Sequence, residues 1–264
     1  MKVEPLDPSD ISNVHSKTTY SICVTNRNNV KTLSDSLDSI LSQIDKSFEL
    51  IVVDAHSDDG SEKVLKEYQE SEKIKLISKK CSRGQGRQIA LENSSGAYVI
   101  SHIDTDDVYR RRLLDLIALY HIKCEGKVMV AISSPGDWTQ NVTIGPREFL
   151  MRIGGWRNLQ WGDDWDLWSR AAMASNYSWT VFPMSDRHRD RQTRSGISKT
   201  LSFRFRRYRD GMSIGRDLFR KEEQISLSQK AMKFLAKVSL YVYPSSLKEL
   251  NGNFMAADPA CFVS

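Results

Sequence analysis

The sequence lacks an apolar run of the about 20 residues that a membrane-spanning helix needs. The longest candidate, residues 234–243, is interrupted by Lys237 and followed by Pro244, so we expect a packed or interfacial helix there. The chain also lacks a basic start followed by an apolar core, which is the pattern of a secretory signal. We therefore expect a cytoplasmic protein.

Cysteine is scarce, with four residues at scattered positions and no paired spacing. This argues against a disulfide framework or a structural zinc site and fits a reducing compartment. A hydrophobic content of 40% and a charged content of 27% are ordinary for folded proteins, so disorder is not expected. A chain of 264 residues can bury one α/β core with a helical appendage.

Short apolar runs alternate with helical patterns along the first hundred residues. We expect buried strands at 20–25, 48–53, 74–77 and 98–103, with helices between them. This alternation predicts an α/β fold with a doubly wound, mostly parallel sheet flanked by helices. Such sheets bind ligands at the carboxyl ends of their strands, where Asp54, Asp104 and Asp106 fall.

An acidic cluster, DTDD at 104–107, directly follows the last of these strands. Carboxylates one residue apart at a strand end can converge on a hard divalent cation, which in turn bridges phosphate oxygens. An Asp-rich turn that caps the next helix would explain the same residues without a metal.

The net charge of +5 is concentrated in one segment, because residues 187–221 contain twelve Lys or Arg and three Asp. Such a segment suits a phosphate partner, although a solvated helix face explains it too. Residues 199–221 combine arginines with Leu201, Phe205 and Phe219 at helical spacing. We expect this amphipathic helix to bind an anionic membrane surface, which would place the protein peripherally at the inner face of the membrane.

Five blocks of sequence resemble, in order, the inverting family 2 glycosyltransferases with the GT-A fold. They are SICVTNRN at 21–28, ELIVVD at 49–54 with SDDGS at 57–61, GQGRQIAL at 84–91, GAYVI at 96–100 with DTDD at 104–107, and GGW at 154–156 with GDDWDLWSR at 162–170. The resemblance covers roughly residues 20 to 200. It divides the chain into a polar leader (1–17), a GT-A catalytic domain (18–198) and a basic amphipathic helical segment (199–264). Within the catalytic domain, 18–108 would be the nucleotide-binding half and 109–198 the acceptor half.

The resemblance implies a hexosyltransferase that moves a sugar from a nucleotide-diphosphate sugar to a hydroxyl of a glycan or lipid-phosphate acceptor. It favours a UDP-sugar, with a GDP-sugar as the alternative, and a Mn²⁺ or Mg²⁺ ion. The residues implied to bind the nucleotide and its phosphates are Thr25, Asn28, Asp54, Arg87, Asp104, Arg187 and Arg191. Many family members carry a second acidic residue after strand two, where this chain has Ala55.

The resemblance also implies that Asp104 and Asp106 bind the metal, with His188 reaching the metal or the diphosphate, and that Asp164 is the catalytic base. The acceptor side would be formed by Asp163 and by tryptophans that can stack on a sugar ring, namely Trp156, Trp161 and Trp165. Hydroxyl attack on an anomeric carbon does need a base, and the departing diphosphate needs charge stabilisation. A helix start, where acids favour the helix dipole, would explain Asp163 and Asp164 equally well.

Three other readings of the sequence remain. A nucleotide-sugar-binding module without turnover would be marked by loss of Asp106 or Asp164, and both are present. A metal-dependent nucleotidyltransferase usually has a Gly-rich loop after its first strand, but residues 25–28 contain no glycine. A nucleic-acid-binding protein is not expected, because the aromatic spacing in 201–219 is helical rather than that of a base-stacking platform.

Overall fold

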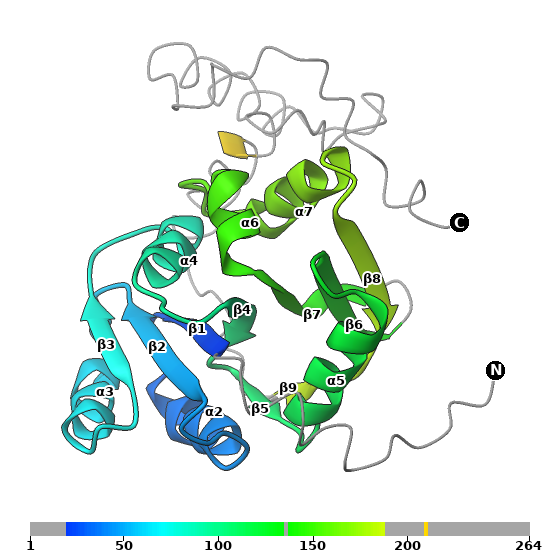
Figure 1. The fold of residues 1–264 in the computed structure, drawn as a ribbon. Helices are drawn as coiled ribbons and strands as arrows, with labels where there is room; N and C mark the ends of the chain where they lie inside the picture. Colours follow the sequence, from blue (N-terminus) through cyan, green and yellow to red (C-terminus); the bar gives the residue numbers. More distant parts are fainter. Residues whose placement is uncertain (1–19, 135–136, 188–208, 211–264) are drawn as a thin grey trace, which may run out of the picture.

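The computed structural model describes residues 20–134, 137–187 and 209–210 (Figure 1). The strands of the main sheet are β1 (Tyr20–Asn26), β2 (Phe48–Asp54), β3 (Lys75–Ser78), β4 (Tyr98–Asp104), β6 (Val128–Ser134), β7 (Asp137–Pro146) and β8 (Tyr177–Val181). A small second sheet pairs β5 (Asp107–Tyr109) with β9 (Ser185–Arg187). The helices in this part of the chain are α2 (Val30–Leu41), α3 (Ser61–Glu70), α4 (Arg83–Glu92), α5 (Leu113–Lys123), α6 (Arg147–Arg152) and α7 (Asp163–Met173).

The main sheet has the strand order β3-β2-β1-β4-β7-β6-β8. The first four strands are parallel and lie where the sequence predicts them, whereas β7 is antiparallel to both of its neighbours. The expected mostly parallel sheet with helices on both faces is therefore confirmed. Figure 1 shows α2, α3 and α5 on one face of the sheet and α4, α6 and α7 on the other.

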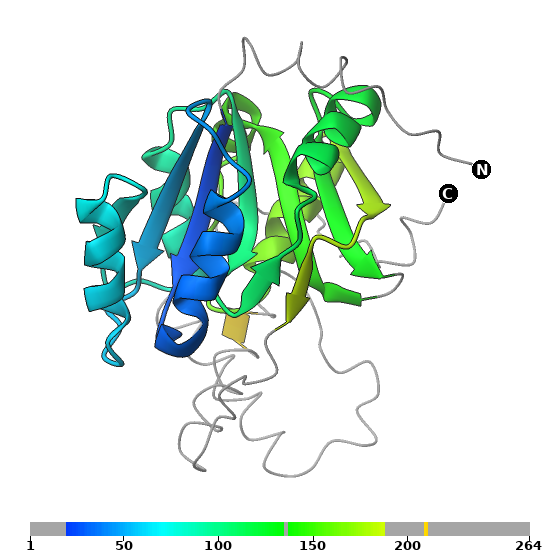
Figure 2. The ribbon, with the colours of Figure 1, turned by 90° about the horizontal axis from the view of Figure 1, so that it is seen from below.

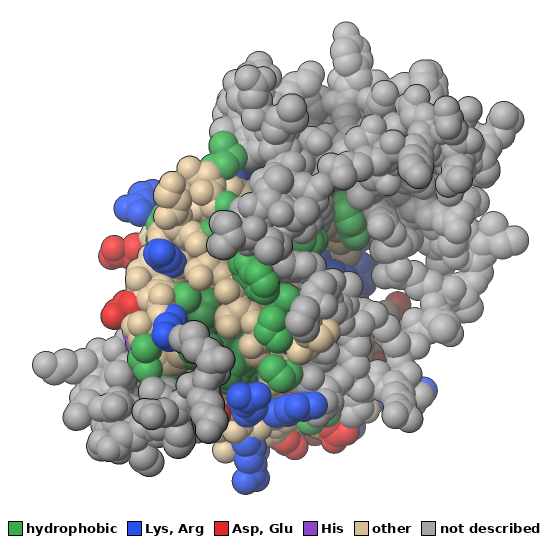
Figure 3. Space-filling view, turned by 90° about the vertical axis from the view of Figure 1, so that its right-hand side faces the viewer, with side chains coloured by type: hydrophobic (Ala, Val, Ile, Leu, Met, Phe, Trp, Pro, Cys, Tyr) green, Lys and Arg blue, Asp and Glu red, His purple; other side chains and the backbone are tan. Residues whose placement is uncertain are grey.

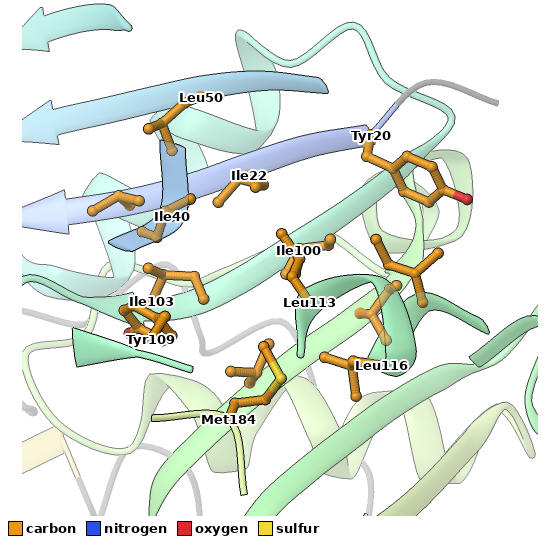
Figure 4. Close-up of a cluster of buried hydrophobic side chains, with 14 of the residues drawn as sticks. Tyr20, Ile22, Ile40, Leu50, Ile100, Ile103, Tyr109, Leu113, Leu116 and Met184 are labelled. Carbon is orange, nitrogen blue, oxygen red and sulfur yellow. The ribbon is translucent and has the colours of Figure 1, made fainter. Parts of the chain in front are cut away.

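Side chains along the central strands alternate between two hydrophobic cores, one on each face of the sheet. On β1, Ile22 faces the core with α2, α3 and α5, whereas Cys23 faces the core with α4, α6 and α7. In Figure 4, Leu50 and Ile100 of the sheet and Leu113 of α5 lie in the first core. A fully buried aliphatic side chain contributes about 1.5–3 kcal/mol. Two filled cores therefore hold the carboxyl ends of the strands in a fixed arrangement.

Strand β4 contains one residue more than β1 over the same length, which makes a β-bulge just before the acidic cluster. Ile100 and Ile103 are three residues apart but pair with β1 residues that are two apart. His102, inside the bulge, has a left-handed backbone with φ 62°. Bulges commonly re-aim the chain beside active sites, and this one sets the direction in which β4 delivers Asp104.

The expected leader, 1–17, lies outside the described residues, as does the basic segment 199–264 apart from Arg209 and Asp210. Within the described ranges, no helix is long and apolar enough to cross a membrane. Figure 3 shows one side of the molecule, where hydrophobic side chains reach the surface between polar ones, and where basic side chains at the lower edge lie beside acidic ones.

Candidate active site

The carboxyl ends of β1, β2 and β4 lie side by side and form one edge of the sheet (Figure 2). Thr25 pairs with Val53 on one side and with Asp104 on the other, and Asn26 pairs with Asp54. Three of the predicted site residues are thus brought together by strand register alone, as expected for a doubly wound sheet.

Asp54 ends β2 and orders the turn that follows. Its carboxylate is fully buried and accepts hydrogen bonds from Asn26 Nδ2 (2.8 Å), the Ser57 hydroxyl (2.6 Å) and the Ser57 backbone N–H (2.9 Å). The Asn26 amide oxygen in turn accepts from Thr105 Oγ1 at 2.7 Å. The structure therefore shows Asp54 as a group that positions the turn at residues 55–57, and its contact with a nucleotide stays a prediction.

Asn28 holds the next turn in a left-handed conformation, with φ 55°. Its side-chain amide donates to Asp58 Oδ1 at 2.7 Å, and its amide oxygen accepts from the Asp58 backbone N–H at 3.0 Å. The neighbouring Asp59 accepts from the Val30 backbone N–H at 2.9 Å and so satisfies the first turn of α2. The loops after β1 and β2 are joined by these bonds into one half-exposed rim.

Asp104 is delivered at the end of β4 with its side chain 40% exposed. Its backbone is fixed by Tyr109, whose phenol oxygen accepts from the Asp104 N–H at 2.8 Å and donates to the Asp104 carbonyl at 3.1 Å. Burial, together with Asp104 and Asp107, raises the pKa of the Tyr109 phenol well above its usual range, so it remains a donor. Asp106, two residues on, is partly exposed. The described residues contain no group of three or more His, Cys, Asp or Glu side chains arranged to hold a metal ion.

Helix α4 brings Arg87, together with Arg83, close to the carboxylates of Asp104 and Asp163. Arg87 is 4% exposed and its Nη1 lies 2.5 Å from Asp163 Oδ2, while its Nη2 lies 3.6 Å from Asp104 Oδ1. This buried ion pair joins α4 to the first residue of α7. Arg87 was expected to face the phosphates of a nucleotide. In this structure it bridges the two halves of the site.

The close approach of α4 to the loop before α7 depends on Gly84. A Cβ at this position would lie 2.1 Å from the Arg157 carbonyl oxygen and 3.0 Å from the Asp163 Cβ. The Gly84 backbone N–H donates to the Leu159 carbonyl at 2.9 Å. The glycine therefore lets α4 pack directly against the loop that leads to α7.

Asp164 lies in the first turn of α7, which Gly162 starts with a left-handed φ of 74°. Burial raises the pKa of the Asp164 carboxyl to about 6, and the negative charge of Asp163 adds to the effect. Arg87, a hydrogen bond from the Trp165 backbone N–H and Arg83 act in the opposite direction. A carboxylate with a pKa near neutrality can accept and release a proton at physiological pH.

The three tryptophans that were predicted to contact an acceptor have different environments. Trp156 is 2% exposed, and its Nε1 lies 3.4 Å from Nε2 of the buried His102, so the expected stacking of Trp156 on a sugar is corrected to a core role. Trp161 and Trp165 are partly exposed, and Trp165 packs edge-on against the buried Trp168 at 5.2 Å. Of the three tryptophans, only Trp161 and Trp165 have exposed surface that a sugar could contact.

Arg187 ends β9 and its backbone pairs with Asp107 of β5, the last residue of the acidic cluster. The other two predicted site residues of this region, His188 and Arg191, lie outside the described residues.

Arg83, one helical turn before Arg87, is a site residue that the sequence motifs do not single out. Desolvation lowers the pKa of its guanidinium, but attraction to Asp104, Asp163, Asp164 and Asp106 outweighs this and raises it. Its i−4 spacing from Arg87 is a signal that could have identified it. Nothing in the sequence pattern indicates the contact of Tyr109 with the Asp104 backbone.

Solved structures share this architecture. The mannosyltransferase PcManGT from Pyrobaculum calidifontis, in complex with GDP-Man and Mn²⁺, has a TM-score of 0.59 and 18% identity over 86% of this chain and 70% of that chain. Residues 1–349 of S. aureus TarS, with UDP-GlcNAc, have a TM-score of 0.59 and 14% identity over 83% of this chain and 79% of that chain. Glucosyl-3-phosphoglycerate synthase from Mycobacterium tuberculosis, with Mn²⁺ and UDP-Glc, has a TM-score of 0.55 and 16% identity over 77% of this chain and 83% of that chain. These likenesses confirm the expected GT-A-like fold.

Sequence comparisons give the family. A putative glycosyltransferase, EpsE of Bacillus subtilis (strain 168), is 26% identical in an alignment 171 positions long that covers 53% of this chain and 62% of the relative. The match thus spans less than two thirds of that relative. The model of glycosyl transferase family 2 matches residues 21–164, more than half of the chain, from the first strand to the start of α7. The chain belongs to glycosyl transferase family 2.

Proposed function

We propose that this chain transfers a sugar from a nucleoside-diphosphate sugar to an acceptor hydroxyl by a single displacement, with Asp164 as the base. The observation that carries the proposal is the position of Asp164 next to the Arg87–Asp163 ion pair, and burial raises the pKa of its carboxyl to about 6, which suits a group that takes up a proton near neutral pH. It lies in the first turn of α7, which the Arg87–Asp163 pair joins to the edge that carries Asp104. A single displacement inverts the anomeric carbon, because no carboxylate nucleophile intervenes.

The residues at the end of β4 fit a divalent cation. Asp104 and Asp106 offer carboxylate oxygens, which Mg²⁺ and Mn²⁺ prefer, and Mg²⁺ commonly binds one or two carboxylates together with water and substrate phosphates. Two carboxylates therefore suffice where a diphosphate supplies further oxygens. Such an ion, when bound, stabilises negative charge on the departing diphosphate.

The donor is proposed to be a UDP-sugar, with a GDP-sugar as the alternative. Structural neighbours were solved with UDP-GlcNAc, UDP-Glc and GDP-Man, so the shared fold accommodates either base. The rim of Asn28 and Asp58 offers hydrogen-bonding groups to a nucleoside. The proposed acceptor is a glycan or lipid-phosphate hydroxyl.

The experiment is a thermal-shift screen of UDP and GDP with Mn²⁺ or Mg²⁺, followed by turnover of the matching sugar nucleotide with water as acceptor. Binding to the native state raises its stability, so the correct base should raise the melting temperature only with metal. NMR of the first-formed sugar from UDP-glucose, which carries an α-linked glucose, should show the β anomer. Binding without sugar release would instead support a nucleotide-sugar-binding module, and first-formed α-glucose would overturn the single displacement.

The metal proposal has its own variant. Asp106→Ala should weaken UDP binding in the presence of Mn²⁺ to the level that the unaltered protein shows with a chelator. The matched control is Asp115→Ala on α5, which removes an exposed carboxylate paired with Arg112 at 3.8 Å. Equal UDP affinity of Asp106→Ala and the unaltered protein, with and without chelator, would rule the metal role out.

The basic segment 199–221 is proposed to bind an anionic membrane surface and bring the site to a membrane-bound acceptor. Each arginine near such a surface contributes about 1 kcal/mol. The protein should sediment with anionic vesicles at low salt, and not with neutral ones, and the triple variant Arg204→Glu, Arg206→Glu, Arg207→Glu should stay in solution. Absence of sedimentation with either vesicle would exclude the membrane role.

A further inference from the structure

The loop that leads into α7 is held by a carboxylate from far along the chain. Asp210 is 1% exposed, and its Oδ2 accepts the backbone N–H of Gln160 at 2.8 Å and that of Trp161 at 3.2 Å. Its other oxygen accepts from the Arg209 side chain at 2.9 Å. Figure 2 shows residues 209–210, in gold, near the edge where the arrowheads of the parallel strands end.

This contact falls on the part of the loop nearest to Asp164. The earlier part is tied to α4, because Gln88 Oε1 accepts the Trp156 N–H at 2.8 Å and the Leu159 carbonyl accepts the Gly84 N–H at 2.9 Å. Asp210 adds a tether at the two residues that directly precede Gly162, the left-handed residue at the start of α7.

A buried carboxylate is costly unless it is hydrogen-bonded, and hydrogen bonds to a charged acceptor are about twice as strong as neutral ones. The buried Asp210 carboxylate is hydrogen-bonded in this way, because it accepts from the backbone N–H groups of two consecutive residues, Gln160 and Trp161. The contact therefore fixes the backbone of Trp161, which is partly exposed three residues before Asp164. Asp210 itself lies beyond the family match, which ends at residue 164.

We infer that Asp210 is a positioning residue of the acceptor side, which holds residues 160–162 so that the Trp161 ring and Asp164 face an incoming acceptor. The turnover part of this inference rests on the proposed function. The donor-side turn, built from Asn26, Asp54 and Ser57, lies on different elements and does not depend on it.

The direct test is hydrogen exchange of the full chain without ligand, followed by mass spectrometry. Asp210→Ala should speed exchange at the Gln160 and Trp161 amides roughly 10-fold, the scale of one lost hydrogen bond. Asp210→Asn, whose amide oxygen can accept the same two N–H groups, should restore slow exchange. Asp115→Ala, an exposed aspartate on α5, is the control that leaves this loop unchanged.

The second readout separates positioning from general structure. With UDP-glucose and Mn²⁺, Asp210→Ala should lower turnover roughly 10- to 100-fold, the scale of a displaced catalytic group. UDP affinity by calorimetry should stay within about twofold, because the donor-side contacts remain. Asp210→Asn should recover turnover.

Unchanged exchange at Gln160 and Trp161 in Asp210→Ala would overturn the tether. Faster exchange with undiminished turnover would overturn the positioning role, as would loss of UDP affinity together with turnover. If the unaltered protein releases no sugar from any donor, the proposed function fails, but the exchange experiment still decides whether Asp210 holds the loop.

Discussion

The two sides of the site are stabilised by different chemistry. On the proposed donor side, at the ends of β1 and β2, the Asp54 carboxylate is surrounded by the neutral groups of Asn26 and Ser57. On the proposed acceptor side, at the start of α7, Arg87 forms a buried ion pair with Asp163 beside a second carboxylate, Asp164. Burial and the neighbouring charges raise the pKa of the Asp164 carboxyl, whereas the Asn26 and Ser57 hydrogen bonds order the turn that follows Asp54. Under the proposed function, the proposed donor side would fix geometry and the proposed acceptor side would transfer the proton.

The largest effect is expected from Asp164→Asn. Removal of a general base typically lowers turnover by roughly 10²-fold or more, while donor-side contacts and UDP affinity should be retained. The measurement is sugar release from UDP-glucose beside UDP calorimetry. If Asp164→Asn keeps full turnover, the base lies elsewhere.

Stability provides the control for this variant. Because the pKa of Asp164 is raised in the folded protein, its ionised form destabilises the fold above about pH 6, and this cost vanishes below about pH 4. Asp164→Asn should therefore raise the free energy of unfolding at pH 8, by at most about 3 kcal/mol, with no difference at pH 4. Asp163→Asn should instead lower the free energy of unfolding, because it removes the charged partner of Arg87. The stability measurement therefore distinguishes the two aspartates, which loss of turnover alone would not.

The second largest effect is expected on stability, when the Arg87–Asp163 ion pair is broken. Arg87→Met leaves the Asp163 carboxylate, 1% exposed, without its partner and should cost about 3–5 kcal/mol of unfolding free energy. The double variant Arg87→Met, Asp163→Leu should recover most of this, because apolar replacement of a whole buried pair is often neutral. Urea denaturation of Arg87→Met, Asp163→Leu and the double variant measures the interaction energy of the two residues. If the loss in the double variant equals the sum of the two single losses, the ion pair is not coupled and the prediction is wrong.

The smallest effect is expected on the donor side. Asn26→Ala removes hydrogen bonds to Asp54 and Thr105 but leaves Asp54 with its Ser57 donors, so we expect a loss of about 1–3 kcal/mol. UDP affinity should fall as the turn loosens, while the pH dependence of turnover stays the same. A stability loss as large as that of Arg87→Met would remove the distinction between the two sides.

Much of the fold could be predicted from the sequence, because strand and helix periodicity depends on local patterning. The four parallel strands and the acids at their ends follow from it. The antiparallel direction of β7 and the bulge at His102 could not be predicted in this way, because they depend on which strands pair.

For the site, the strand pattern predicted that Asp54 and Asp104 lie together at the carboxyl ends of the strands, and the strand register confirms this. The sequence pattern did not predict that Trp156 would be buried against His102, because periodicity does not show which aromatic rings reach the surface. The Arg87–Asp163 pair and the Asp210 tether are contacts between distant segments, 76 residues apart in the first case, and no local pattern encodes them.

The central claim is that Asp164 accepts the proton of the acceptor hydroxyl, and the pH dependence of kcat/KM for UDP-glucose tests it most directly. The base must be ionised, so the rate of the unaltered protein should be level above about pH 6 and fall about tenfold per pH unit below it. The residual rate of Asp164→Asn should lack this acid limb. An acid limb near pH 6 that persists in Asp164→Asn, or its absence from the unaltered protein, would contradict the account.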